Sequence, residues 1–249
     1  MRAVLLYMVL GLSVVWSDTY ALIVTVGKYA RIEGISAARK DARAYSAIAK
    51  RLGADTIVKL EDENATRRNI RDSLSRIEAK LKRGDRFFMF FSGHGSSLYD
   101  PFYSGAFQAA GMTEMLRDSG VLLPYDFNPE RIASTVIVGK RDLRPVLTKI
   151  DEKIDFGMVV FDACYTETTV RGEKEVRIVC TPYILTENEG YPYRHIVYVA
   201  SSIAEAQSGI FSSVLERCVG SEIDTEHLKA CLSRYMRKRV QIPAVITPQ

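Results

Sequence analysis

The 249-residue sequence lacks the residue spacings of several common binding sites. None of its four cysteines forms a C-x-x-C pair, and His195 and His227 do not stand at ligand spacing, which argues against a zinc site. Gly27 follows the first expected strand, but no G-x-G-x-x-G accompanies it, which argues against a Rossmann-type nucleotide site. The sequence also contains no internal repeat and no low-complexity segment. These patterns therefore indicate no metal site and no cofactor.

A strong excess of one sign of charge is also missing. The chain has 34 lysines and arginines against 30 acidic residues, a net charge of +4, spread along the sequence apart from the basic run 234–239. A run of this kind is usually a solvated helix face, so we expect no nucleic-acid partner. An apolar share of 47% and a charged share of 26% are typical of a soluble globular protein. Because no second core is evident, residues 20–249 are interpreted as a single domain.

One long apolar stretch stands at the start of the chain. Arg2 and the apolar residues up to Trp16 fit a secretory signal peptide, and the stretch is shorter than the roughly 20 residues of a transmembrane helix. Two candidate cleavage sites follow, at Ser17 with Val15 and at Ala21 with Thr19. Neither matches the usual small-residue pattern well, so residues 1–17 are either a removed signal peptide or a retained N-terminal anchor. We expect an exported protein, periplasmic or secreted, that contacts a membrane only if this segment is retained.

Three of the cysteines leave two interpretations open. If the chain is exported, Cys218 and Cys231 could form a disulfide. Alternatively, these two residues and Cys180 are small buried apolar side chains, which is the interpretation we favour from the sequence.

Strand and helix patterns alternate along most of the chain. Apolar runs predict strands at 21–26, 56–60, 86–91, 158–161 and 196–200, and more weakly at 176–180. Apolar residues at helical spacing predict helices over 37–52, from Asn64 or Thr66 to about 81, and over 142–150, 210–219 and 226–239. Residues 96–138 are interpreted as an elaborated loop or hairpin, and the last ten as a tail or edge strand. The alternation predicts an α/β fold with a mostly parallel central sheet of about six strands and helices on both faces.

Two of the apolar runs lead into reactive side chains. Arg86-Phe-Phe-Met-Phe-Phe-Ser-Gly precedes His94, and Gly157-Met-Val-Val-Phe-Asp-Ala precedes Cys164. In parallel sheets, ligands collect at the carboxyl ends of the strands. If the two strands are neighbours, the imidazole and the thiol meet at one edge, which is the minimum apparatus for a cysteine nucleophile.

Ser92-Gly-His94-Gly and Asp162-Ala-Cys164-Tyr resemble the histidine and cysteine motifs of the caspase-like cysteine peptidases, closest to the metacaspase and bacterial caspase-domain branch. Weaker likenesses at 21–29, 40–42, 122–126 and 199–202 extend the resemblance over nearly all of the chain after residue 17. It implies the three-layer caspase–haemoglobinase sandwich and a peptidase acting on protein or peptide substrates.

Chemistry assigns the roles within such a site. Cys164 would attack a peptide carbonyl as the thiolate, and His94 would take the thiol proton and protonate the leaving amine. The backbone N–H groups of Gly95 and Cys164 are the natural oxyanion-hole donors. Asp162, two residues before the nucleophile, would attract an Arg or Lys side chain of the substrate. The resemblance adds Asp41 and Ser92 to this basic-selective pocket, although Asp41 could equally be a surface charge on its helix.

Some features depart from the family. Thr166 and Glu167 follow the cysteine motif where Ser and Gly are usual, so a catalytically degenerate module that binds a partner protein is the alternative function. The Gln-Ala-Cys pattern of animal caspases is absent, so cleavage after aspartate is not expected. Some metacaspases need calcium, but the acidic residues here lack the spacing of a calcium loop, and the sequence leaves that requirement and the oligomeric state open.

Overall fold

The computed structural model describes residues 17–36, 38–98, 100, 102–117, 119–164, 191–201, 209–236 and 243–248, with Cys164 described by its backbone alone. The expectations for residues 1–16, for a strand near 176–180, for Cys180 and for Thr166 and Glu167 fall outside these ranges. Within them, no helix has both the length and the apolar character needed to cross a membrane.

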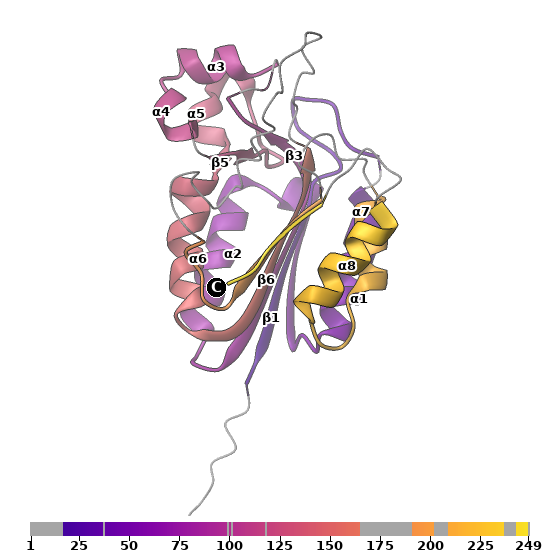
Figure 1. Ribbon diagram of the computed structural model, residues 1–249. Helices are drawn as coiled ribbons and strands as arrows, with labels where there is room; N and C mark the ends of the chain where they lie inside the picture. Colours follow the sequence, from indigo (N-terminus) through magenta and orange to yellow (C-terminus); the bar gives the residue numbers. More distant parts are fainter. Residues whose placement is uncertain are drawn as a thin grey trace, which may run out of the picture.

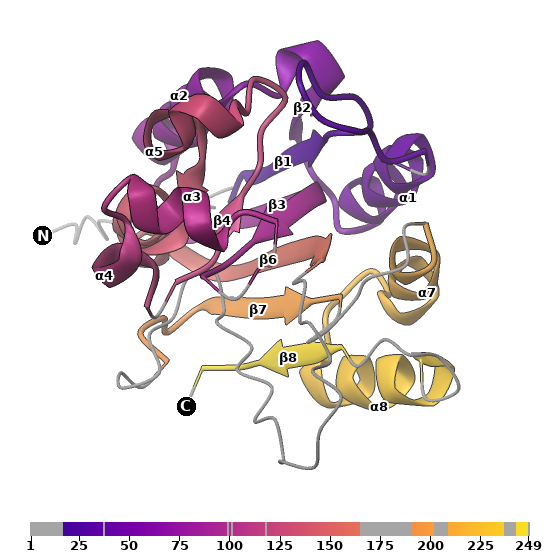
Figure 2. The same ribbon diagram turned by 90° about the horizontal axis from the view of Figure 1, so that it is seen from above.

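A central sheet organises the structure. Its six strands stand in the order β2-β1-β3-β6-β7-β8, and all neighbouring pairs are parallel except β7 and β8 (Figure 2). Their bounds are β1 Thr19–Thr25, β2 Thr56–Glu61, β3 Asp85–Ser96, β6 Ile154–Cys164, β7 Ile196–Ala200 and β8 Ala244–Ile246. The predicted mostly parallel sheet is confirmed, and the last residues of the chain supply its antiparallel edge strand.

Helices cover both faces of the sheet, as Figure 1 shows. One face packs against α1 (Ala38–Arg51), α7 (Phe211–Cys218) and α8 (Thr225–Met236), and the other against α2 (Arg67–Lys80) and α6 (Arg144–Asp151). The side chain of Thr66 caps α2 by accepting a hydrogen bond from the Asn69 N–H, as one of the two predicted caps requires. A turn of 3-10 helix, η1 (Asp62–Asn64), precedes α2, and a short π-helix, η3 (Gly139–Leu143), precedes α6. The three-layer sandwich is therefore confirmed.

Two apolar cores lie on the two faces, because successive side chains of a strand point to opposite sides. On β3, Phe88 and Phe90 pack toward α1, α7 and α8, whereas Phe87, Met89 and Phe91 pack toward α2 and α6. All five phenylalanine and methionine side chains are fully buried, which explains why the run is apolar at every position.

Residues 96–138 form more than the loop or hairpin that we inferred. After β3, the chain builds three short helices and two short strands: α3 Ser104–Ala109, α4 Thr113–Leu116, β4 Val121–Leu122, α5 Ile132–Thr135 and β5 Ile137–Val138, with a turn of 3-10 helix, η2, at Pro129–Arg131. These elements enclose a third apolar cluster that includes Phe107, Leu123 and Phe127. The helices have only four to six residues each, too short for a periodic pattern to reveal them. Strand β4 does pair antiparallel with β3, so the hairpin component of the interpretation holds.

The strands that carry His94 and Cys164 extend beyond their apolar runs. We expected both residues in polar turns, but β3 continues to Ser96 and β6 to Cys164. Pairing explains the difference, because the β3–β6 ladder continues through His94 and Cys164 and β4 pairs with Gly95 and Ser96. Both residues are therefore held by the sheet itself.

A disulfide joins the two helices at the end of the chain. Cys218 in α7 and Cys231 in α8 are bonded, with Cα atoms 5.6 Å apart. Our preference for small, separately buried thiols was therefore wrong for these two residues. Buried apolar thiols and a disulfide have the same sequence pattern, and only the packing of α7 against α8 distinguishes them. Closing a loop of this size contributes about 3 kcal/mol to stability.

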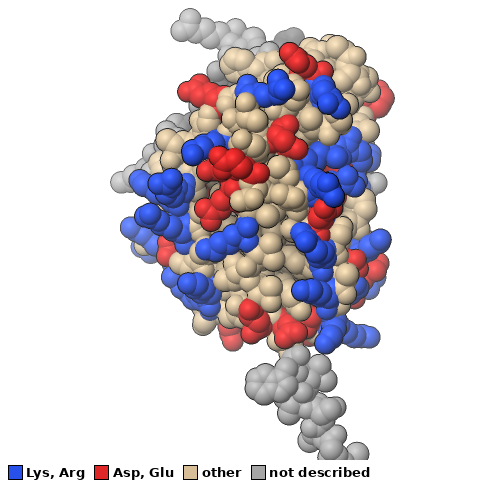
Figure 3. Space-filling model, turned by 180° about the vertical axis from the view of Figure 1, so that it is seen from behind, with Lys and Arg blue, Asp and Glu red and all other residues tan. Residues whose placement is uncertain are grey.

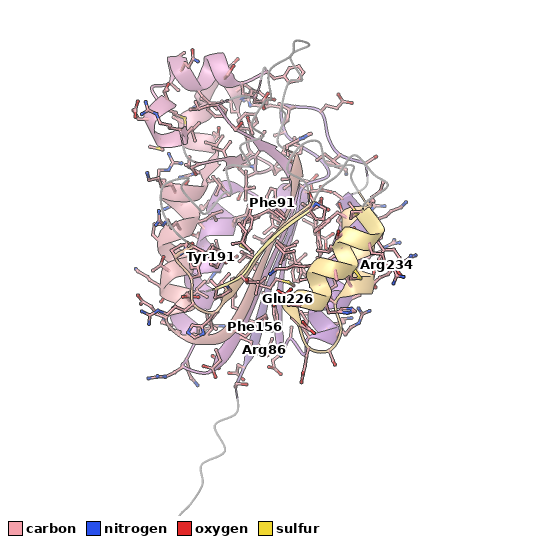
Figure 4. All side chains as sticks on the ribbon, in the orientation of Figure 1. Arg86, Phe91, Phe156, Tyr191, Glu226 and Arg234 are labelled. Atoms are coloured by element: carbon pink, nitrogen blue, oxygen red, sulfur yellow. A yellow bond between two sulfur atoms is a disulfide. The ribbon has the colours of Figure 1, made fainter. Side chains whose placement is uncertain are left out.

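The amino ends of the strands carry no predicted site residue. There, the Arg86 guanidinium carbon lies 5.2 Å from the ring centroid of Phe88 and 5.9 Å from that of Phe156. Figure 4 shows Arg86 and Phe156 near the lower end of the sheet and Phe91 toward the upper end, where the strands finish. From behind, Figure 3 shows basic and acidic side chains interspersed over the described surface of that side.

Candidate active site

His94 and Cys164 are direct neighbours in the sheet. Their Cα atoms are register partners on the parallel strands β3 and β6, and they form the last pair of this ladder. Positions of equal register on parallel strands belong to the same face. The meeting at the carboxyl edge, which the apolar runs suggested, is therefore present at the level of the backbone.

Two contacts from the loop after β1 fix His94. The backbone N–H of His94 donates to the Tyr29 hydroxyl at 2.6 Å, and the two rings lie 5.0 Å apart. The imidazole Nε2 lies 3.1 Å from the Glu33 carbonyl oxygen. Because a carbonyl oxygen only accepts hydrogen bonds, Nε2 carries the proton, which leaves Nδ1 of the neutral ring as a proton acceptor.

The neighbouring glycine makes the Tyr29 contact possible. A Cβ atom on Gly93 would lie 2.9 Å from the Tyr29 hydroxyl oxygen and 3.0 Å from the Phe91 ring, so the Tyr29 hydroxyl would have to move. Gly93 therefore lets Tyr29 pack closely beneath His94, a role that its place in the motif alone does not reveal.

The surroundings of His94 favour its neutral form. Burial lowers the pKa of the imidazole, and the Glu33 carbonyl and the Glu33 and Asp100 carboxylates offset part of that effect. At neutral pH, the ring is thus available to take up a proton.

A buried acidic cluster lies on the α1 and α7 face, and its two strand residues stand two positions before His94 and Cys164 along β3 and β6. Asp41 of α1 is fully buried and accepts hydrogen bonds from Ser92 at 2.7 Å and from Ser212 of α7 at 2.6 Å. The alternative of a surface charge is therefore excluded for Asp41. Burial raises the pKa of its carboxyl group, and the two serine hydroxyls and the Gly209 N–H lower it.

Asp162 completes this cluster from β6, where it is the register partner of Ser92. Its side chain is 5% exposed and accepts a hydrogen bond from the Tyr45 hydroxyl at 3.0 Å. Burial, and then the nearby Asp41 charge, raise the pKa of Asp162 to about 7, while the Ser201 and Tyr45 hydroxyls lower it. Two carboxylates thus share a low-dielectric site, and the charge of Lys40, an exposed residue of α1, lowers the pKa of Asp41 in part.

The sequence of this chain matches that of a known protein family. The sequence profile of the caspase domain family matches residues 18–213, from the start of β1 into α7. The chain belongs to the caspase domain family. This family comprises cysteine peptidases, and the predicted resemblance is confirmed at that level.

Structural comparison supports the fold of this caspase domain. The crystal structure of protein GSU0716 from Geobacter sulfurreducens covers 93% of this chain and 93% of its own, with a TM-score of 0.64 and 16% identical residues. At this identity the likeness concerns the fold alone. No curated protein matches the sequence.

Sequence reasoning missed several residues of the caspase domain's site. Tyr29, Tyr45 and Ser212 hold His94, Asp162 and Asp41, yet each is an ordinary polar residue in an apolar pattern. Ser212 is separated from Asp41 by 171 positions, so only the packing of α7 on α1 brings them together.

Gly95 and Cys164 lie on the adjoining strands β3 and β6, and their role as oxyanion-hole donors stays a prediction. Among the described residues, no three His, Cys, Asp or Glu side chains converge as metal ligands would.

Proposed function

We propose that this caspase domain is a cysteine endopeptidase that hydrolyses peptide bonds after Arg or Lys through Cys164 and His94. The observation that carries the proposal is the register pairing of His94 with Cys164. Asp162 lies two residues before Cys164 on β6, and its buried carboxylate is close to that of Asp41. The pairing supplies the nucleophile and its base, and the carboxylates supply the charge that a basic side chain requires.

The proposed reaction follows from the protonation state of His94. The unprotonated Nδ1 accepts the thiol proton of Cys164, and the thiolate sulfur adds to the carbonyl carbon of the scissile peptide. Backbone N–H groups at Gly95 and Cys164 stabilise the oxyanion. As the carbon–nitrogen bond breaks, the imidazolium returns its proton to the leaving amine, and a thioester remains. Water then hydrolyses the thioester with His94 as the base, which regenerates the thiol.

The acidic cluster provides the specificity. With a pKa of about 7, the Asp162 carboxyl group is close to half protonated at neutral pH in the free protein. A guanidinium or ammonium group in the pocket would favour the charged carboxylate and relieve the repulsion from Asp41. An acidic substrate side chain would instead add a third negative charge, so cleavage after aspartate is disfavoured.

A matched set of fluorogenic peptides tests this function. We expect kcat/KM for substrates with Arg or Lys before the scissile bond to exceed that for citrulline by about 100-fold or more, because citrulline keeps the shape of Arg without its charge. An Asp substrate should give no detectable turnover. Equal turnover of the Arg and citrulline peptides would contradict the specificity.

The same protein distinguishes the enzyme from a degenerate binding module. A Cys164 thiolate activated by His94 should react with iodoacetamide within minutes at neutral pH, and alkylation should abolish cleavage in proportion. An unreactive thiol together with no cleavage of any peptide would favour the binding module.

We also propose that the chain is exported, supported by the apolar stretch at 1–17 and by the Cys218–Cys231 disulfide. Of the two candidate cleavage sites, the one at Ser17 is favoured, because Thr19 to Ala21 belong to β1 and Ala21 is fully buried.

Intact mass spectrometry of protein recovered from the periplasm or medium should show loss of the first 16 or 17 residues. The mass should then rise by about two hydrogens on reduction, as opening one disulfide requires. A full-length chain would support the anchor instead.

A further inference from the structure

A cavity borders His94, apart from the acidic cluster. Its volume is about 260 Å³, and its wall includes His94 and Gly95 together with the side chains of Ile32, Tyr103 and Leu123. This volume suits one amino-acid side chain and is smaller than the usual site for a drug-sized ligand. None of its lining residues belongs to the acidic cluster of Asp41, Ser92, Asp162 and Ser212.

Most of the cavity wall is apolar, and packing and a hydrogen bond support it. Tyr103 packs edge-on against the buried Phe127 ring, with centroids 5.3 Å apart, and the Leu123 N–H donates to the His94 carbonyl at 2.9 Å. Phe102 forms the outer rim and is 80% exposed, the highest exposure among the large apolar side chains described. An exposed aromatic ring beside a preformed apolar hollow is a feature of binding sites.

Two carboxyl groups give the cavity its charge. Asp100 is buried and accepts hydrogen bonds from the Ser96 hydroxyl at 2.6 Å and from the Phe102 N–H at 2.9 Å, so it holds the wall in place. Glu33 is exposed at the rim. Among the residues that the structure describes, no lysine or arginine lines the cavity. An acidic side chain would therefore be repelled, while an apolar one would be accepted.

We propose that this cavity receives the side chain of the residue that follows the scissile bond, and that it selects large apolar residues there. The inference rests on the proposed function. The acidic cluster, which would hold the basic side chain, shares no lining residue with the cavity, so the two sites are separate and can hold the side chains on the two sides of the scissile bond. His94 protonates the nitrogen of that following residue, which places its side chain next to the imidazole and hence at the cavity.

Internally quenched peptides with a fixed Arg before the scissile bond test the inference. The next residue is varied among Gly, Leu, Phe, Asn and Asp. We expect kcat/KM for Leu or Phe to exceed that for Gly by about tenfold or more, and Asn to exceed its isostere Asp by about threefold or more. Equal kcat/KM for Leu and Gly would overturn the inference while leaving cleavage after Arg intact.

A pair of exposed apolar residues supplies variant and control. Phe102→Ala removes the rim, and its high exposure makes a folding defect unexpected, so it should lower kcat/KM for the Leu or Phe peptide several-fold more than for the Gly peptide. Met115→Ala removes an exposed apolar side chain outside the cavity and should leave the Leu-to-Gly ratio unchanged. A ratio unaffected by Phe102→Ala, with Ile32→Ala also without effect, would refute the assignment of this cavity. If no Arg peptide is cleaved at all, both the inference and the proposed function fall.

Discussion

Cys164→Ala should lower kcat/KM on an Arg peptide by about 10³-fold or more, and His94→Ala by a comparable factor. In the proposed mechanism the register pair on β3 and β6 acts as one catalytic unit, so removal of either residue leaves the other without a partner. For the same reason, the double variant should be little worse than either single variant. Initial rates on the fluorogenic Arg peptide measure all three.

The control for this prediction is His195, which directly precedes β7. It therefore lies at the amino ends of the parallel strands, whereas His94 lies near their carboxyl ends. Its backbone N–H donates to Asp151, whereas its side chain has no part in the proposed reaction. His195→Gln should keep wild-type kcat/KM. Full activity in Cys164→Ala would end the peptidase assignment, and additive losses in the double variant would show that the two residues act separately.

The pairing of His94 with Cys164 in the sheet could be foreseen because its signal is local. A fully apolar run of the kind seen before His94 and Cys164 indicates a strand buried on both faces, and parallel strands present their carboxyl ends at one edge. These two facts place the two residues at the same end of the sheet without any knowledge of the neighbouring loops. The exact ends of the strands could not be foreseen, because pairing with β4 and β6 extends β3 past its apolar run.

The buried acidic cluster, the proposed specificity pocket, was only partly foreseeable. Asp162 is placed by its distance from Cys164, but the burial of Asp41 depends on Ser212 in α7, and a helix docking 171 positions away leaves no local pattern. The cavity beside His94 depends in the same way on the packing of Tyr103 against Phe127. Local sequence thus predicts the reactive groups, whereas the shape that surrounds them comes from long-range packing.

Asp162→Asn should remove the preference for basic substrates while making the folded protein more stable at neutral pH. The loss of one carboxylate leaves a cation in the pocket facing only Asp41, and we expect kcat/KM for the Arg peptide to fall by about 100-fold. Turnover of the citrulline peptide should change much less, because it carries no charge. The ratio of the two substrates measures the effect and cancels any change in the dyad.

The pH dependence of that ratio provides a sharper test. In the free enzyme the pKa of Asp162 is about 7, so the ratio of Arg to citrulline kcat/KM in the wild type should rise as pH increases through 7 and level off above it. The Asn variant should show no such rise. A wild-type ratio that is flat between pH 5.5 and 8.5 would mean that Asp162 does not supply the charge.

The stability change follows from the same shift, with its sign set by linkage. In the unfolded chain the Asp162 carboxyl ionises near 3.8, and in the folded protein only near 7, so between these values the folded state holds a proton that the unfolded state has lost. Stability attributable to this group therefore falls as pH rises from about 4 to 7. Asn avoids that loss and can still accept the Tyr45 hydrogen bond, so the variant should be more stable than wild type by roughly 2–4 kcal/mol at pH 8 and nearly equal at pH 4.

Urea unfolding at the two pH values measures this difference in stability. The matched control is Asp155→Asn, because Asp155 is an exposed residue at the other end of β6. If Asp162→Asn is less stable than wild type at pH 8, the Asp162 carboxylate supports the fold. A gain in stability together with a loss of Arg cleavage would show that the buried Asp162 charge serves substrate binding at a cost in stability.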